Sequence, residues 1–70
     1  MLMITRMEIL KNGYVMIAEK LDSEDLHGAM AMAKGLGLID LVNEIGELMY
    51  CTDDEYEPFR KGLIRHLIEE

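Results

Sequence analysis

The clearest pattern in the chain is a helical repeat of apolar residues between positions 38 and 51. The apolar side chains recur at spacings of three and four, the period of one face of an α-helix: Leu38, Leu41, Val42, Ile45, Leu48 and Met49. Polar residues fall on the opposite side of the same helical wheel: Asp40, Asn43, Glu44 and Glu47. The pattern predicts an amphipathic helix over 38–51 with Ile45 at the centre of its buried face.

A shorter helix is predicted before it, over about 23–34. Asp22 or Ser23 can cap the free N–H groups at its start, since short polar side chains favour that position. Gly35 follows the last apolar position and is a typical helix stop.

The last helix is predicted over about 58–68. Pro58 fits the first turn of a helix and disrupts its interior, so the helix is expected to begin there. Residues 52–57 are then left as an acidic turn, in which Thr52 and Glu55 have the spacing of a capping box.

The first third of the chain has the pattern of a β-hairpin. Two apolar-rich segments, residues 2–10 and 14–21, flank an Asn12-Gly13 pair, a strong hairpin signal. A three-residue loop separates apolar from polar side chains better than a two-residue loop does. We therefore predict an α+β fold in one small domain, residues 1–70, with a two-stranded antiparallel hairpin followed by the three short helices.

The charge of the chain is strongly negative. The chain has fourteen acidic residues and seven Lys and Arg residues, which gives a net charge of −7 at pH 7. Such a surface repels nucleic-acid phosphates and anionic lipid headgroups, so neither nucleic acid nor a membrane is an expected partner. It suits a protein partner with a basic surface, and it equally suits the simpler role of keeping an apolar-rich chain soluble.

Cysteine content and hydropathy indicate the compartment. The single cysteine, Cys51, excludes an intrachain disulfide. The apolar run at the N-terminus is too short for a signal peptide, and no stretch approaches the roughly 18 apolar residues of a membrane span. We expect a cytoplasmic protein, with Cys51 as a buried thiol.

No arrangement of residues predicts catalysis. Cys51 and His66 could in principle form an activated thiolate, but no oxyanion donor accompanies them. The Gly35-Leu36-Gly37 segment lacks the third glycine of a phosphate-binding loop. The acids of the predicted turn lack the alternate spacing of a calcium loop. We expect a non-enzymatic protein without cofactor or metal.

Two surfaces are candidates for binding a partner. The first is an acidic patch that could imitate phosphate spacing and occupy a basic channel: Asp53, Asp54, Glu55, Glu57, Glu44 and Glu47. These acids could instead only cap a helix and remain solvated. The second is an apolar patch for a partner or a dimer contact, formed by Met32 and Leu36, of which Met32 lies off the main stripe of its helix.

The function follows from composition more than from any motif. Half of the residues are apolar, more than a 70-residue core is expected to absorb, and the hairpin would leave open sheet edges, so a homodimer is expected. In general type the chain is similar to small inhibitors encoded by phages and other mobile elements. That profile implies a module that occludes a basic site on a bacterial nucleic-acid-handling defence protein. The alternative is a small host regulator or assembly adaptor.

Overall fold

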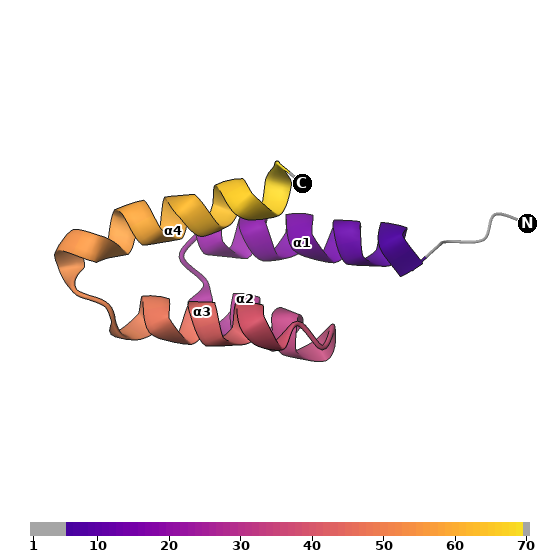
Figure 1. The fold of residues 1–70 in the computed structure, drawn as a ribbon, viewed down its shortest axis with the longest axis horizontal. Coiled ribbons are helices and arrows are strands. Elements are labelled where there is room, and N and C mark those ends of the chain that lie inside the picture. The colour runs from indigo at the N-terminus through magenta and orange to yellow at the C-terminus, as the bar shows by residue number, and fades with distance from the viewer. Residues whose placement is uncertain (1–5, 70) are drawn as a thin grey trace, which may run out of the picture.

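The computed structural model describes the backbone of residues 6–69 and the side chains of residues 10–69, and the regular structure in this part of the chain is all helical (Figure 1). Four α-helices follow one another: α1 (Arg6–Asp22), α2 (Leu26–Gly35), α3 (Ile39–Tyr50) and α4 (Asp53–Ile68). The predicted α+β class is therefore wrong, because residues 6–69 contain no strand and form a small all-α domain.

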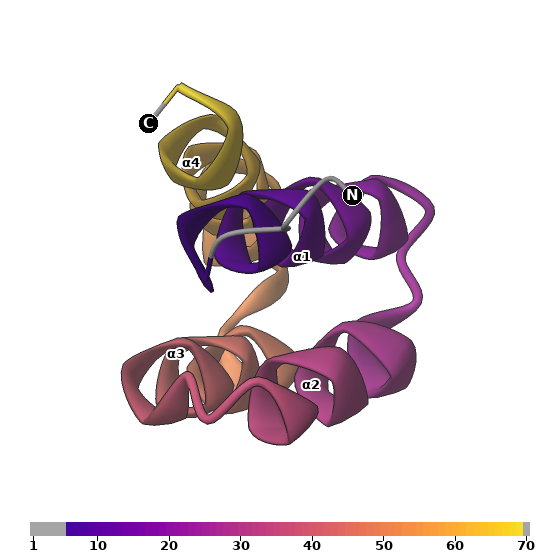
Figure 2. The same cartoon turned by 90° about the vertical axis from the view of Figure 1, so that its right-hand side faces the viewer.

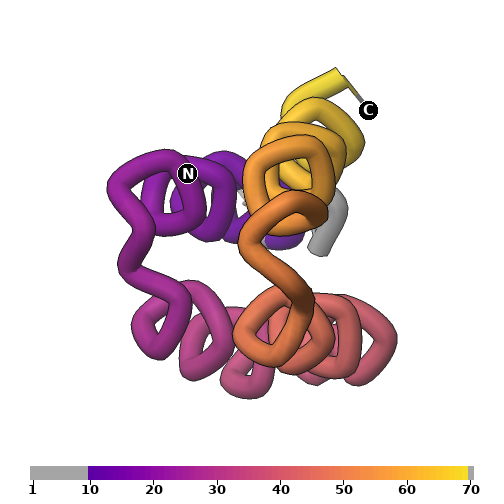
Figure 3. The backbone as a smooth tube through the Cα atoms, turned by 90° about the vertical axis from the view of Figure 1, so that its left-hand side faces the viewer, coloured from indigo at the N-terminus to yellow at the C-terminus, as the bar shows by residue number. Residues whose placement is uncertain are grey.

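The helices lie in two layers, with α1 and α4 in one and α2 and α3 in the other (Figure 2). Helix α1 packs along both α4 and α2, and α2 packs along α3. Helices α3 and α4 meet over a short stretch only. The α1–α2 and α3–α4 connections cross between the layers, as Figure 3 shows from the end of the molecule.

The predicted hairpin is replaced by one continuous helix, α1, which runs through Asn12 and Gly13. A strand would place Val15 and Ile17 on the same face, but Val15 is 41% exposed and Ile17 is fully buried. The residues of α1 that face the core, Ile17 and Leu21 with Tyr14 beside them, instead have helical spacing. The part of the first expected strand at residues 2–5 lies outside the described residues.

Packing explains why an Asn-Gly pair is accepted inside α1. Gly13 is buried, and a β-carbon at this position would collide with the side chain of Leu36. The glycine thus lets α1 approach the end of α2 closely. Glycine in a helix costs about 1 kcal/mol relative to alanine, a small cost beside the apolar burial that the continuous helix permits.

A single apolar cluster joins the helices. Its buried members come from all four helices: Ile17, Ala18, Leu21, Ala29, Ala33, Leu41, Ile45, Leu48, Leu63 and Leu67. Ile45 is fully buried, which confirms the predicted phase of the helix over 38–51. None of the helices described is both long enough and apolar enough to cross a membrane.

The start of α2 lies one turn later than predicted. Asp25, not Asp22 or Ser23, is its N-cap residue, and the Asp25 carboxylate accepts a hydrogen bond of 3.0 Å from the backbone N–H of Gly28. Asp22 is still part of α1, and the Ser23 hydroxyl donates to the carbonyl of Lys20. The polar segment from Asp22 to Asp25 therefore contains both the last residue of α1 and the N-cap residue of α2.

The end of α2 depends on Gly37, although Gly35 was predicted as the stop. Gly37 has a φ of 74°, a conformation that glycine adopts without strain. The backbone N–H of Leu38 donates to the carbonyl of Ala33 at 2.9 Å, and that of Gly37 donates to Lys34 at 3.1 Å. These two bonds form a Schellman motif that turns the chain directly into α3.

Helix α4 begins at Asp53, five residues before the predicted start, so residues 52–57 are not a separate turn. Pro58 lies inside the helix. Proline removes one helical hydrogen bond there, to the carbonyl of Asp54, an exposed residue near the helix start where water can replace the lost donor. Thr52 occupies the N-cap position, but its side chain makes no capping hydrogen bond, so the predicted capping box does not form.

Candidate functional site

The first turn of α4 carries a group of exposed acids at the end of the molecule where α3 passes into α4. Asp53, Asp54 and Glu55 are all exposed. None of them forms a salt bridge within the described residues. The partial positive charge at a helix N-terminus favours carboxylates there. The fold therefore tolerates these three charges without neutralising them.

An exposed tyrosine adjoins this acidic turn. Tyr50, the last residue of α3, is 90% exposed, the largest exposure among the large apolar side chains of the described residues. Tyr50 was not among the candidate residues predicted from the sequence. Its position off the apolar stripe of residues 38–49 was the signal that indicated exposure. Tyrosine is a frequent anchor in protein interfaces, because it offers a large contact area and a hydrogen-bonding group.

Glu57, by contrast, belongs to a structural ion pair and is not a free member of the acidic patch. The side-chain nitrogens of Arg60 donate to both carboxylate oxygens of Glu57, with the guanidinium Nη2 at 2.9 and 3.0 Å. Lys61 lies 3.9 Å from the same carboxylate. The charge of Glu57 is thus largely offset within α4.

Arg60 joins this ion pair to the end of α1. It is only 9% exposed, and its Nη1 donates to the backbone carbonyls of Leu21 at 3.1 Å and Asp22 at 3.2 Å. These carbonyls lie in the last turn of α1, where the regular helical donors run out and the Leu21 carbonyl accepts one other bond, from the backbone N–H of Glu24 at 3.1 Å. A cation is also favoured at this negative end of the helix dipole. Arg60 therefore stabilises the packing of α4 against α1.

Electrostatics around Arg60 support this role. Hydrogen bonding to Glu57 raises the pKa of Arg60 above its already high ordinary value, so the side chain is always charged. The Tyr56 ring lies 5.9 Å from the Arg60 guanidinium, within the range of a cation–π contact. Burial raises the pKa of the Tyr56 phenol, and the nearby carboxylate of Glu24 adds to the shift.

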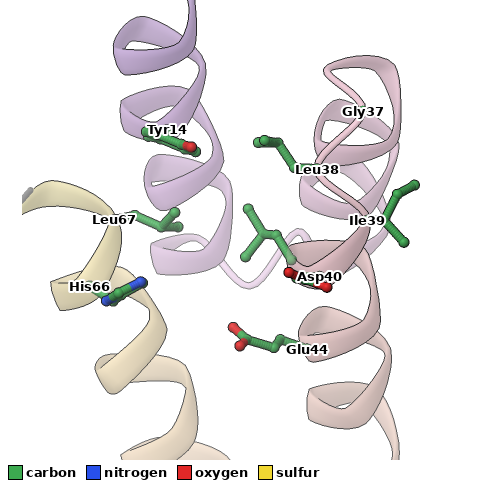
Figure 4. Close-up of a pocket in the computed structure, with 9 residues that line it drawn as sticks. Tyr14, Gly37, Leu38, Ile39, Asp40, Glu44, His66 and Leu67 are labelled. Atoms are coloured by element: carbon green, nitrogen blue, oxygen red, sulfur yellow. The ribbon is translucent and has the colours of Figure 1, made fainter. Parts of the chain in front are cut away.

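A groove of about 440 Å³ opens between α3 and α4, with α1 at its back (Figure 4). Its apolar lining comes from Tyr14 of α1, Leu38 and Leu41 at the start of α3, and Leu67 of α4. Sequence analysis did not predict this groove, because it depends on where α3 and α4 separate.

Polar groups line the same groove on both sides. Asp40 and Glu44 lie one helical turn apart on α3, and Figure 4 shows Glu44 extending toward His66 of α4. Neither carboxylate takes part in a salt bridge among the described residues. The groove thus combines an apolar wall with two uncompensated negative charges.

The structure separates the acids that were predicted as one patch. Glu44 lines the groove, Glu47 is exposed on the following turn of α3, and Asp53 lies at the start of α4. Met32 and Leu36, the predicted apolar patch, are half-buried and pack against the core. Leu36 in particular covers Gly13, so much of its apolar surface is used within the domain.

The thiol and the imidazoles form no combined site. Cys51 is half-buried beyond the C-terminal end of α3, and its Sγ lies 3.2 Å from the carbonyl of Leu48. His66 instead faces the N-terminal half of α3, and His27 is exposed on α2. The part of the chain that the structure describes contains no cluster of three or more potential metal ligands.

No protein-family model, curated protein or solved structure gives a significant match to this chain. The exposed acidic turn with Tyr50 and the groove between α3 and α4 are therefore the features from which a function can be argued.

Proposed function

We propose that this protein is a small, acidic, non-enzymatic binding module that docks on a basic surface of a protein partner. The observation that carries the proposal is the first turn of α4, where Asp53, Asp54 and Glu55 are exposed and unpaired within the described residues, next to the exposed ring of Tyr50. An aromatic anchor surrounded by charges is a common arrangement at protein interfaces.

The most concrete form of this function is inhibition. A compact chain with a net charge of −7 can enter a channel that normally holds nucleic-acid phosphates and exclude them. The partner is then a bacterial nucleic-acid-handling protein, such as a defence nuclease, and the chain acts in the cytoplasm as an inhibitor of the kind that phages and mobile elements encode. A host regulator or assembly adaptor is the alternative.

Homodimerisation remains part of the proposal on a narrower basis. The argument from open sheet edges no longer applies, since residues 6–69 contain no strand. Exposed apolar side chains still support it, above all Val15 and Met16, which are adjacent on α1. Light scattering distinguishes a dimer from a single chain of 8.0 kDa.

The proposal is tested by capture from a bacterial lysate. The immobilised protein is compared with a variant carrying Asp53→Asn, Asp54→Asn and Glu55→Gln, which keeps the shape of the turn and removes its charge. We expect the parent to retain a basic protein that elutes as salt rises, because screening shortens the reach of charges to about 8 Å at physiological ionic strength. The neutralised variant should retain much less of it.

A second variant controls for the loss of charge alone. Glu19→Gln, Asp22→Asn and Glu69→Gln removes three exposed charges that are not part of the first turn of α4, and it should retain the partner as the parent does. Equal retention by the turn variant and the parent would show that the acids of α4 only favour the helix start. Equal losses in both variants would show unspecific attraction by net charge.

A further inference from the structure

The groove between α3 and α4 has a chemical character that the acidic turn lacks. Its lining is part apolar, from Tyr14, Leu38 and Leu67, and part acidic, from Asp40 and Glu44. Its volume of about 440 Å³ lies within the range of sites that enclose small ligands or side chains. A ligand that fills it must therefore be both apolar and positively charged.

The α3 side of the groove carries two carboxylates. Asp40 and Glu44 have i,i+4 spacing, at which like charges repel, while the helix dipole favours Asp40 in the first turn of α3. Both acids line the groove, and no Lys or Arg of the described residues pairs with either of them. His66 of α4 lies opposite them across the groove. A cation supplied from outside would relieve this repulsion.

We infer that this groove is the docking site for a basic amphipathic helix of a protein partner. Apolar side chains on one face of that helix pack against Tyr14, Leu38 and Leu67, while a flanking Lys or Arg pairs with Asp40 and Glu44. A helix fits because α3 and α4 form the two walls of the groove. In helix-in-groove recognition, the docked helix presents its apolar side chains at positions i, i+3, i+4 and i+7. The inference rests on the proposed role in protein binding and names the element of the partner.

The first test is binding of a defined probe to the full chain. The probe is a fluorescently labelled helical peptide of about 15 residues, with Leu at i, i+3, i+4 and i+7 and Lys at the flanking positions. A matched peptide carries Glu in place of every Lys. Fluorescence anisotropy should show saturable binding of the Lys peptide and none of the Glu peptide.

Substitutions then locate the binding site. Asp40→Asn with Glu44→Gln should weaken binding about fivefold at low salt, a modest effect because the groove is open to solvent. The matched control, Glu19→Gln with Glu69→Gln, removes the same charge at exposed positions outside the groove and the acidic turn, and it should change affinity by less than about twofold.

A third variant tests the apolar wall. Leu38 occupies the N-cap position of α3 without a side-chain capping bond, so Leu38→Ser removes apolar lining and at the same time supplies a favourable cap. The new cap offsets part of the packing that Leu38 makes with the core, so the protein should remain folded while peptide affinity falls about tenfold.

Several results would overturn the inference. They are absence of Lys-peptide binding, equal binding of the Glu peptide, or equal weakening by the groove variant and the Glu19→Gln, Glu69→Gln control. Competition between the peptide and self-association, with the groove variants abolishing the dimer, would assign the groove to a second copy instead. Each of these leaves capture through the acidic turn unaffected, so the failure of this inference is distinguishable from failure of the proposed function.

Discussion

Replacing Arg60 with methionine is the perturbation that best tests how the four helices are held together. The guanidinium is buried, and it supplies the donors for the carbonyls of Leu21 and Asp22 in the last turn of α1. Methionine keeps much of the volume but has no donor, so the Leu21 carbonyl keeps only the backbone N–H of Glu24, at 3.1 Å, and the Asp22 carbonyl loses the Arg60 donor.

The expected loss follows from these contacts. A hydrogen bond to a charged group contributes about 1.5–3 kcal/mol, and Arg60→Met removes two of them, those to the carbonyls of Leu21 and Asp22. Burying a guanidinium is itself costly, so removing it returns part of this energy. The ion pair with Glu57 adds little, because that carboxylate is half-exposed. Arg60→Met should therefore lower the free energy of unfolding by about 2–4 kcal/mol.

Urea unfolding followed by helical circular dichroism measures this change. The matched control is Arg65→Met, on the same helix, where the side chain is exposed and the change should stay within about 0.5 kcal/mol. Arg60→Lys should fall between the two, because an ammonium cannot bridge the α1 carbonyls and Glu57 as a planar fork does. If Arg60→Met and Arg65→Met unfold at the same urea concentration, Arg60 does not stabilise the contact between α1 and α4.

Three further substitutions test the helix ends and the core. Gly37→Ala should cost about 1–2 kcal/mol of stability, because alanine is strained at a φ of 74°. Gly35→Ala, in the last turn of α2, should instead stabilise the protein by up to about 1 kcal/mol. Melting temperatures that shift in the same direction for both variants would contradict the role of Gly37 in ending α2. Ile45→Ala should cost about 2–5 kcal/mol through the cavity it leaves, and a melt within a few degrees of the parent would show that Ile45 is not buried.

The sequence predicted best the elements whose local pattern agrees with their packing. The stripe around Ile45 in α3 is periodic over its full length, and its burial follows the prediction. The N-terminal segment failed because Asn12-Gly13 is a strong local turn signal, while the opposing signal depends on tertiary contact. Gly13 is favoured by the close approach of Leu36, a residue 23 positions later in the sequence.

The parts of the candidate site that depend on local sequence could be predicted, and those that depend on tertiary contacts could not. The exposure of Asp53 and Asp54 follows from their polarity, and the exposure of Tyr50 could have been predicted from its position off the apolar stripe. The pairing of Glu57 with Arg60 becomes a local i,i+3 contact once the helix is known to begin before Pro58. The groove requires the arrangement of α1, α3 and α4, which no local pattern encodes.

Amide chemical-shift mapping of the isotope-labelled protein with the Lys–Leu peptide tests most directly the claim that the groove between α3 and α4 accepts a basic helix. We predict saturable shifts concentrated at residues 37–41 and at Tyr14, Glu44, His66 and Leu67, which line the groove. Shifts confined to residues 53–55, or spectra unchanged at saturating peptide, would contradict the claim.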